Sequence, residues 1–529
     1  MSPDPYLIQA QDDTVTTGFQ GVAETIDGWF GGIEDFYGGI IFVEVAPNIS
    51  LIVLLAIVVG VSLTAYFGFI QFRKMNISLE VLKGKWSRKS DPGEVTHFQG
   101  LASALSATVG MGNVAGVAAA VSLGGPGATF WMICAGLVGM CTKFVECTLG
   151  VKYRKIDENG MVHGGPFQYL KVAFRKLGKV PVAILTGIFA IGILLFGWLG
   201  GGMFQANQAF AQVRSVTGGD DGFMGSDAAA IIFGLGMALL IALVIIGGIK
   251  SIATVAEKIV PSMAILYVVA GLVVLVANIT NIPAAFGSIV EGAFSPEGVA
   301  GGVIGVMFIG FQRAFFSNEA GVGSAPIAHS AVKTRRPVSE GFNAMLEPFI
   351  DTVVVCTMTA LIIIVADQPS YHDAREQAAD GGGPGDIVVT SDAFGSVISW
   401  FPVVLAVAVF LFAFSTLITW SYYGIQAWRH LFGTSKFSDT VYRLVLCVLV
   451  VIGCIMSFSN IIDFADAALF TCIFVNMAGM LVLAPKVKEE MTQYLADRRA
   501  GKLMDDPEPL PHEREEIATE GEKVTADSI

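Results

Sequence analysis

Residues 310–326 read Gly310-Phe-Gln312-Arg313-Ala-Phe315-Phe316-Ser317-Asn318-Glu319-Ala-Gly321-Val-Gly323-Ser324-Ala-Pro326. Charged and amide side chains are costly in hydrocarbon, so within an apolar segment they must face protein or water. Here they stand between two apolar halves together with glycine, which lowers helix propensity. The stretch therefore predicts a membrane helix that is interrupted near its middle. Arg313 and Glu319 are candidates for an ion pair.

A second apolar segment has a similar centre, Ser103-Ala-Leu-Ser-Ala-Thr108-Val-Gly110-Met-Gly112-Asn113-Val-Ala-Gly116. Its small residues can serve a close helix crossing, because small-xxx-small spacing lets two backbones approach. The other interpretation is a broken helix, whose unwound backbone is tolerated at the midplane only where it lines a cavity. Composition alone does not separate the two interpretations. The interrupted stretch at 310–326 favours the broken helix.

The whole chain has the composition of a membrane protein. Of its 529 residues, 53% are hydrophobic and 15% are charged, against about 25% charged in soluble domains. This excludes a soluble or a disordered chain, and the net charge of −13 argues against nucleic acid as a partner. The seven cysteines lie in apolar segments without CxxC spacing and are expected to be buried hydrophobes. The six histidines lie in polar connections, which leaves an intramembrane histidine proton relay without candidates.

Apolar runs of about twenty residues, each long enough to cross about 30 Å of hydrocarbon, recur along the sequence. They lie at 48–70, 99–122, 127–150, 182–206, 228–247, 259–280, 300–323, 343–366, 401–424, 441–458 and 462–484. The prediction is an all-α polytopic membrane protein with about eleven transmembrane helices. Its expected parts are an acidic extracytoplasmic segment at 1–46, a transmembrane core at 47–485 and a charged cytoplasmic tail at 486–529. This tail is expected to be solvated and partly disordered.

The distribution of basic residues predicts the orientation, because cytoplasmic loops carry an excess of Lys and Arg. With the N-terminus outside and the spans alternating, the inner connections hold 28 of the 32 basic residues. The outer connections hold only Arg214 and Arg375. We therefore expect a multi-pass protein of the inner or plasma membrane with its N-terminus outside and its C-terminus in the cytoplasm.

The two interrupted segments are the second and the seventh spans, so each one opens a set of five. A secondary transporter built from inverted repeats has this arrangement. Spans 2–6 and 7–11 would be the repeats, and the first span an accessory helix. Lys143 and Glu146 in the third span are expected to pair. Glu347 and Asp351 lie near the inner end of the eighth span, either solvated at the interface or as part of a gate.

The ninth span carries a polar stripe at helical spacing that includes Ser415, Thr419, Tyr422 and Gln426, with Thr416 beside it. Such hydroxyls commonly bond to carbonyls of their own helix. Aimed at the carbonyls of a broken helix, they can instead complete an all-oxygen shell around a small hard cation such as sodium. We favour the sodium site.

These segments together resemble the alanine or glycine:cation symporter family, the sodium–alanine symporters. The matching stretches are His97-Phe-Gln-Gly-Leu-Ala-Ser-Ala-Leu, Thr108-Val-Gly-Met-Gly-Asn-Val-Ala-Gly-Val117, Gly124-Gly-Pro-Gly-Ala-Thr-Phe-Trp-Met132, Gly164-Gly-Pro-Phe-Gln-Tyr-Leu170, Phe316-Ser-Asn-Glu-Ala-Gly-Val-Gly-Ser-Ala-Pro326 and Trp420-Ser-Tyr-Tyr-Gly424. The resemblance covers residues 50–485. The chain departs from the family pattern at Ala314-Phe315 and at Met111, where Thr is common, and Met111 can change which side chain the pocket presents.

The resemblance implies a LeuT-type 5+5 core in which sodium and a small neutral amino acid bind between the two broken helices. Amide groups of the first break would hold the substrate carboxylate, because the start of a half-helix carries partial positive charge. The second break would hold the ammonium group, and Phe315 and Trp420 would form apolar walls. The implied substrate residues are Thr108, Gly110, Gly112, Asn113, Gln205, Phe315, Ser317, Asn318 and Trp420. The implied sodium ligands are the carbonyls of Ser106, Val109 and Phe412 and the hydroxyls of Ser415 and Thr416.

The function implied by the resemblance is sodium-coupled symport of alanine or glycine into the cell by alternating access, with sodium as the coupling ion and no cofactor. One alternative is a proton-coupled symporter on the same fold, with Glu319, Glu347 or Asp351 in the coupling role. Another is a membrane receptor that binds an amino acid without transporting it. An enzyme is not expected, because the sequence has no HExxH motif and no nucleophile with a paired base.

Overall fold

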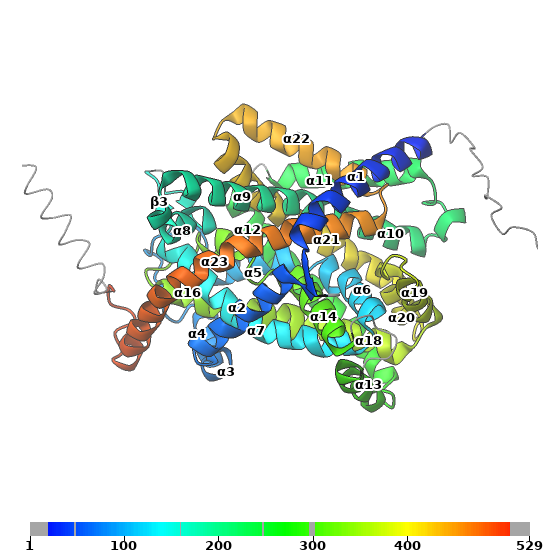
Figure 1. Cartoon of the computed structure of the whole chain (residues 1–529), viewed down its shortest axis with the longest axis horizontal. Helices are drawn as coiled ribbons and strands as arrows, with labels where there is room; N and C mark the ends of the chain where they lie inside the picture. The colour runs from blue at the N-terminus through cyan, green and yellow to red at the C-terminus, as the bar shows by residue number, and fades with distance from the viewer. Residues whose placement is uncertain (1–18, 47–48, 159, 246–247, 296–301, 508–529) are drawn as a thin grey trace, which may run out of the picture.

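The computed structural model describes residues 19–46, 49–158, 160–245, 248–295 and 302–507. The chain is a helical bundle with two small hairpins, β1–β2 (Glu44–Ala46, Ile49–Ser50) and β3–β4 (Lys155–Ile156, Val162–His163). The helices of the predicted repeats are α5 (His97–Thr108), α6 (Ala115–Gly124), α7 (Gly127–Lys152), α9 (Lys179–Trp198), α10 (Phe204–Val216), α11 (Asp227–Ile245), α12 (Gly248–Ala277), α14 (Gly302–Asn318), α15 (Ala325–His329), α16 (Pro337–Ala344), α17 (Leu346–Pro348), α18 (Thr357–Ala366), α21 (Phe401–Phe432), α22 (Lys436–Gly453) and α23 (Phe458–Arg499). Around them lie α1 (Phe19–Ile41), α2 (Leu51–Tyr66), α3 (Ile70–Arg73), α4 (Met75–Leu82), α8 (Pro166–Ala173), α13 (Ile282–Phe294), α19 (Pro369–Ala379) and α20 (Ile387–Gly395) (Figure 1). Residues 1–18 of the predicted N-terminal segment, residues 508–529 of the tail and the predicted span ends at 48, 246–247 and 300–301 lie outside the described residues.

The second predicted span is a broken helix, as the sequence predicts. Thr96 begins α5 with a capping box, in which its hydroxyl accepts the Gln99 N–H at 3.2 Å and the Gln99 side chain accepts the Thr96 N–H at 3.0 Å. The helix ends at Thr108, and Gly110 is extended. Helix α6 resumes at an angle of 60°.

The seventh predicted span is broken as well. Helix α14 ends at Asn318, and Glu319, Gly321 and Gly323 follow with φ of +54°, +88° and +87°. Glycine adopts this left-handed region without a steric penalty, and the backbone cannot continue an α-helix through it. Five further residues, Ala325–His329, then form the short helix α15.

The helices of the structure can be compared with the eleven predicted spans. Among the described residues, seven helices are long and apolar enough to cross a membrane, or eight when the bent pair α5–α6 counts as one span. Helices α2 and α13 are shorter apolar helices, and α14 has 17 residues. The structure therefore confirms an all-α protein with many apolar spans. The count of eleven and the repeat layout stay predictions.

Helix α23 continues to Arg499, whereas the sequence predicts a solvated tail from residue 486. Ion pairs to three neighbouring segments hold this extension against the bundle. They are Lys152–Glu490 at 2.5 Å, Arg336–Asp497 at 2.5 Å and Arg498–Glu80 at 3.0 Å. Charges that suggest solvation in the sequence therefore have partners far away along the chain.

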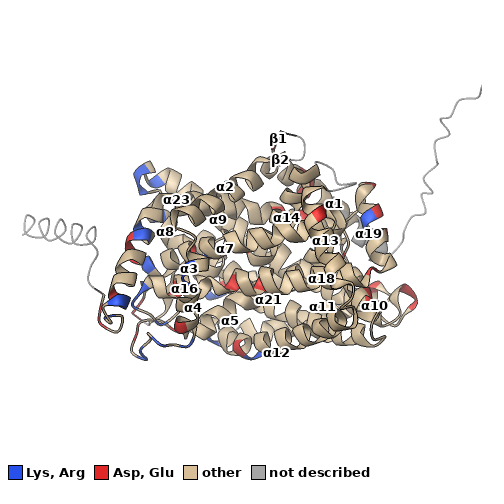
Figure 2. Cartoon of the chain, turned by 90° about the horizontal axis from the view of Figure 1, so that it is seen from below, with Lys and Arg blue, Asp and Glu red and all other residues tan. Residues whose placement is uncertain are grey.

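Basic residues gather at one end of the bundle. Figure 2 shows Lys and Arg concentrated where α8, α16 and the end of α23 lie, which we call the basic end. Helices α10 and α19 lie at the opposite end and carry few of them. Sequence segments that are widely separated thus place their positive charge on one side, as the positive-inside rule requires of a membrane protein.

The expected pair between Arg313 and Glu319 is wrong. The Arg313 guanidinium contacts the carboxylate of Asp466 on α23, and Gln312 Nε2 donates to the same oxygen at 2.9 Å. Both charged side chains are buried. Residues six apart on a helix do not share a face, and Glu319 lies beyond the end of α14, so the two side chains diverge.

We expect Arg313→Gln to reduce the free energy of unfolding by about 3–5 kcal/mol, because it leaves the Asp466 charge buried without a partner. Asp466→Asn should cost a similar amount. The double variant should lose less than the sum of the two single losses. Thermal unfolding of the purified proteins in detergent measures the loss of stability in each variant. Additive losses in the double variant would contradict the pairing.

Candidate functional site

The two breaks contact each other inside the bundle. A Cβ added to Gly112 would lie 3.2 Å from the Cα of Ser317. Asn113 Oδ1 accepts the Gly110 N–H at 2.8 Å, and Gln205 Oε1 accepts the Met111 N–H at 3.1 Å. These bonds satisfy amide groups that lose their helical partners at the break. The structure therefore brings together the predicted residues Gly110, Gly112, Asn113, Gln205 and Ser317.

A π-helical turn over Leu199–Met203 places Gln205 at the first break. Gln205 Nε2 donates to the Gly200 carbonyl at 2.9 Å, which fixes the direction of the amide group. Turns of this kind are rare and frequent at functional sites. The turn also makes room for Trp420, because a Cβ added to Gly201 would lie 2.3 Å from the indole.

Asp351 is a site residue that the sequence did not resolve. It is fully buried in a second π-helical segment, Phe349–Cys356, so a solvated position at the interface is wrong. Asn113 Nδ2 donates to Asp351 Oδ1 at 2.6 Å, and Ser317 Oγ donates to Oδ2 at 2.8 Å. Thr352 Oγ1 also donates to Asp351 Oδ2 at 2.8 Å. The same threonine hydroxyl accepts a hydrogen bond from Asn318 Nδ2 at 2.9 Å. One carboxylate thus joins both breaks, and no basic side chain within the described ranges pairs with it.

The predicted sodium ligands lie beside the first break. Ser106 Oγ donates to the Ser415 carbonyl at 2.7 Å, which ties α5 to α21. Ser415 Oγ donates to the carbonyl of Phe412 on its own helix at 2.9 Å, as the purely structural interpretation expects. Thr416 differs, because its buried hydroxyl has no hydrogen-bond partner. That oxygen lies 2.5 Å from a Cβ added to Gly110, so it points at the broken backbone. Val109, the residue that follows α5, has an extended backbone. Its carbonyl is therefore not aligned with the carbonyls of the helix.

The aromatic residue at the breaks is Phe316 rather than Phe315. The Phe316 ring lies 3.7 Å from a Cβ added to Gly112. The Phe315 ring packs against Phe311 and Phe470, with centroids 5.9 and 6.3 Å away. Adjacent helical residues point about 100° apart, so the sequence did not show which of the two faces the site.

Trp420 and Thr108 make other contacts than the resemblance implies. The indole N–H of Trp420 donates to Glu319 Oε1 at 2.9 Å, and Ser324 Oγ donates to the second oxygen of Glu319 at 2.5 Å. Trp420 therefore holds Glu319 in its left-handed conformation at the second break. Thr108 donates to the Ala104 carbonyl of its own helix at 3.3 Å.

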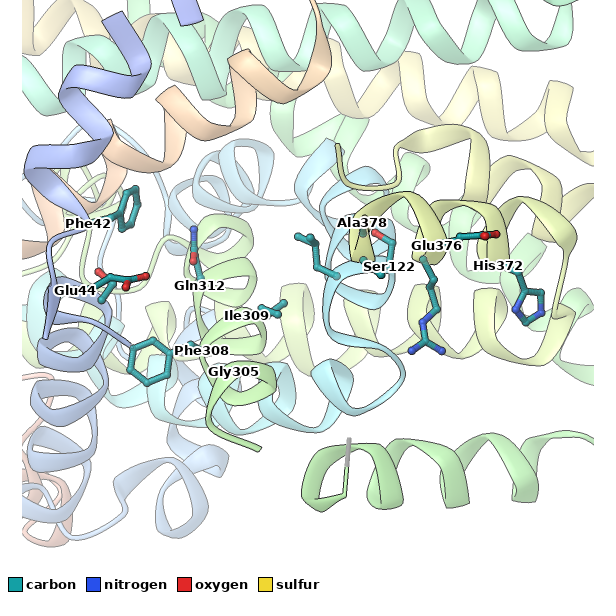
Figure 3. A pocket seen from close by; sticks show the side chains of 14 residues that line it. Phe42, Glu44, Ser122, Gly305, Phe308, Ile309, Gln312, His372, Glu376 and Ala378 are labelled. Carbon is teal, nitrogen blue, oxygen red and sulfur yellow. The ribbon is translucent and has the colours of Figure 1, made fainter. Parts of the chain in front are cut away.

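A cavity of about 590 Å³ opens at the end of the bundle opposite the basic end. In Figure 3, Phe308, Ile309 and Gln312 of α14 face it from one side, and His372 and Glu376 of α19 from the other. Gln312 is hydrogen-bonded to Asp466, the partner of Arg313. The buried ion pair therefore lies between this cavity and the breaks.

Known proteins share sequence and fold with this chain. The family description "Sodium:alanine symporter family" matches residues 41–507. The sodium/alanine symporter AgcS of Methanococcus maripaludis is 36% identical over 437 residues, which are 82% of this chain and 91% of that protein. An uncharacterized transporter of Haemophilus influenzae is 37% identical over 443 residues, with 82% and 91% covered. The crystal structure of MhsT in complex with L-phenylalanine has a TM-score of 0.53 at 17% identity and covers 74% of this chain and 88% of that one, which shows a shared fold.

Exchanging the two partners at the centre of the site tests the Asn113–Asp351 contact. Asp351→Asn should lower the melting temperature in detergent, because one of the two acceptor oxygens, which serve Asn113 on one side and Ser317 and Thr352 on the other, becomes an N–H donor. Asn113→Asp should do the same by placing two carboxylates together. The combined exchange restores a donor–acceptor pair and should recover part of the loss. A double variant that is as unstable as the summed single variants would refute the contact.

Proposed function

The chain belongs to the sodium:alanine symporter family, and from this premise we propose that it carries a small neutral amino acid, alanine or glycine, into the cell together with sodium. As a member of this family it is a transporter and not an enzyme. The observation that carries the sodium part is the unpartnered hydroxyl of Thr416, which is buried and points at the first break.

Sodium would lie between α5 and α21. A buried polar group without a partner costs free energy, so the Thr416 hydroxyl is a ready ligand. The Ser415 hydroxyl and the carbonyls of Ser106, Val109 and Phe412 would supply further oxygens. The bond between Ser106 and the Ser415 backbone, at 2.7 Å, supports this set because it holds the two helices within reach of one ion.

The substrate carboxylate would bind at the first break, where the amides now have side-chain partners. Gln205 Oε1 accepts a hydrogen bond from the Met111 N–H, and Asn113 Oδ1 accepts one from the Gly110 N–H. A carboxylate oxygen is a stronger acceptor than an amide oxygen, so it would replace the Gln205 contact. Asp351 and the hydroxyl of Ser317 would face the substrate ammonium group from the other side.

The narrow approach of the breaks supports a small substrate. Phe316 and Ser317 lie close to Gly112, which leaves little room for a long side chain. One methylene in a pocket discriminates by about 1–3 kcal/mol, so exclusion by shape would set the preference for alanine or glycine.

Transport would proceed by alternating access across the bilayer. We assign the basic end to the cytoplasm, which leaves the N-terminus outside and the C-terminus inside. The charge distribution in Figure 2 supports this orientation. Sodium and substrate would bind the closed form better than the open forms, so that joint loading drives closure. The membrane potential supplies about 2.3 kcal/mol per charge per 100 mV.

Uptake of labelled alanine into proteoliposomes tests the coupling ion. With a sodium gradient the lumen should accumulate alanine, and replacement of sodium by potassium at constant pH should abolish accumulation. Undiminished uptake in potassium would reject sodium coupling in favour of a proton-coupled symporter. Binding of alanine in detergent without accumulation in liposomes would instead indicate a receptor.

The double variant Ser415→Ala with Thr416→Ala tests the ion site. It should raise the sodium concentration for half-maximal uptake by about tenfold or more, because two oxygen ligands are lost. Ser421→Ala is the matched control on the same helix, since among the described residues Ser421 Oγ bonds the Ile418 carbonyl of its own helix alone, at 2.6 Å. An unchanged sodium dependence in the double variant would disprove this placement.

A further inference from the structure

A chain of buried ionisable side chains leads from the second break toward the basic end. Its members are His97, Glu340, His329, Glu347, Lys143 and Glu146, and none is more than 4% exposed. Lys143 Nζ lies 2.8 Å from Glu347 and 3.8 Å from Glu146, so the predicted pair exists with a closer third member. Asn476 connects the chain to the break, because its amide donates to Glu146 at 3.1 Å and to the Gly321 carbonyl at 2.9 Å. The sequence places all six histidines in polar connections, but His97 and His329 fold inward and are buried.

Glu340 joins the ends of both broken helices. His97 is the first residue of α5, and its Nδ1 contacts Glu340 Oε2. His329 is the last residue of α15, and its Nδ1 lies 2.6 Å from Glu340 Oε1. Asn343 Nδ2 bonds both Glu340, at 2.8 Å, and the His97 carbonyl, at 2.9 Å. One carboxylate on α16 therefore holds together the two half-helices that would have to part when the protein opens at the basic end.

His329 has a second nitrogen that is not yet engaged. Its Nε2 lies 3.8 Å from Glu347 Oε2, and both atoms are buried without a hydrogen-bond partner. The other oxygen of Glu347 binds Lys143. An imidazole with protons on both nitrogens would satisfy Glu340 and Glu347 at once. The neutral ring satisfies only one of them.

The charges around His329 favour this extra proton. Glu340 and Glu347 flank the ring from α16 and α17, His97 faces it from α5, and α7 contributes Lys143, Glu146 and Cys147. Arg154 lies nearby, but its guanidinium donates to the carbonyls of Pro92, Ser330, Val332 and Thr334 at 2.5–2.8 Å. Lys143 is thus the permanently charged partner of Glu347 and Glu146, whereas the buried carboxylate of Glu340 contacts only the two histidines among the described ionisable side chains. Buried charges require compensation.

We propose that His329 is a proton-binding site, which takes up a proton from the cytoplasm at Nε2 as α15 closes against α17 and returns it to the cytoplasm when the two helices separate. The protonated ring donates hydrogen bonds to both Glu340 and Glu347, which keeps the basic end closed. The neutral ring leaves Glu347 Oε2 without a hydrogen bond and favours opening. The proposal rests on the transport function proposed above, but it concerns the opening step and not the coupling ion. Cytoplasmic acidification therefore slows turnover while the dependence on external sodium is retained.

Proteoliposomes that contain the full chain test this proposal. Alanine uptake is measured at constant external pH and sodium while the internal pH is raised from about 6, just below the ordinary pKa of histidine at about 6.5, to about 9. The wild-type rate should rise about tenfold, the factor given by one charge-assisted hydrogen bond. His329→Gln keeps a hydrogen-bond donor without a titratable proton, and its rate should be high and independent of internal pH. A wild-type profile in this variant would overturn the proposal.

His163→Gln is the matched control. His163 is a half-buried histidine of β4 at the same end of the protein, 3.5 Å from Asp157, and its replacement should leave the internal pH profile as in the wild type. If His329→Gln does not fold, Glu347→Asp keeps the charge but withdraws the carboxylate from Nε2. Its rate should then rise at a lower internal pH, and an unshifted profile would overturn the proposal. Loss of sodium dependence in the wild type would reject the proposed coupling and not the proton site.

Discussion

Backbone groups in hydrocarbon must find hydrogen-bond partners within the protein, and the rest of this structure depends on that constraint. Two helices stop in the middle of the bundle, and each break frees amides and carbonyls that water cannot reach. Asn113 and Gln205 satisfy amides of the first break, and Asn476 binds the Gly321 carbonyl at the second. Asn113 lies in the first break itself, whereas Gln205 and Asn476 come from helices distant in sequence. These partners place polar side chains at the centre of an apolar bundle.

The same polar side chains would allow the proposed site to bind ions and zwitterions. Asp351 accepts from residues of both breaks, and Thr416 keeps a free hydroxyl beside the first. Toward the basic end, Glu340 takes one contact from each half-helix through His97 and His329. Sodium, substrate and proton would then act on the same two interrupted helices from different levels of the bundle. If one of these helices moves at one site, the hydrogen-bond partners at another site change, which is the physical basis of coupling between sites.

Much of the fold followed from patterns in the sequence. Glycine and polar residues within apolar runs predicted both breaks, and the basic connections predicted a basic end. Single contacts were harder to foresee. Arg313 pairs with Asp466 and not with Glu319, because only the packing of α14 against α23 decides which carboxylate is near. Phe316 rather than Phe315 faces Gly112, because helical phase relative to a neighbour is not written in a local motif.

The sequence by itself determined that this is a membrane protein, that it is helical, which family it belongs to and where both helices break. These properties depend on composition and local pattern. The tertiary structure decided which buried charges meet. Asp351, His97 and His329 look like residues of polar ends in the sequence, yet all three are buried against partners from other helices. A buried charge is stable only beside its partner, and that partner is chosen by the packing of helices far apart in the chain.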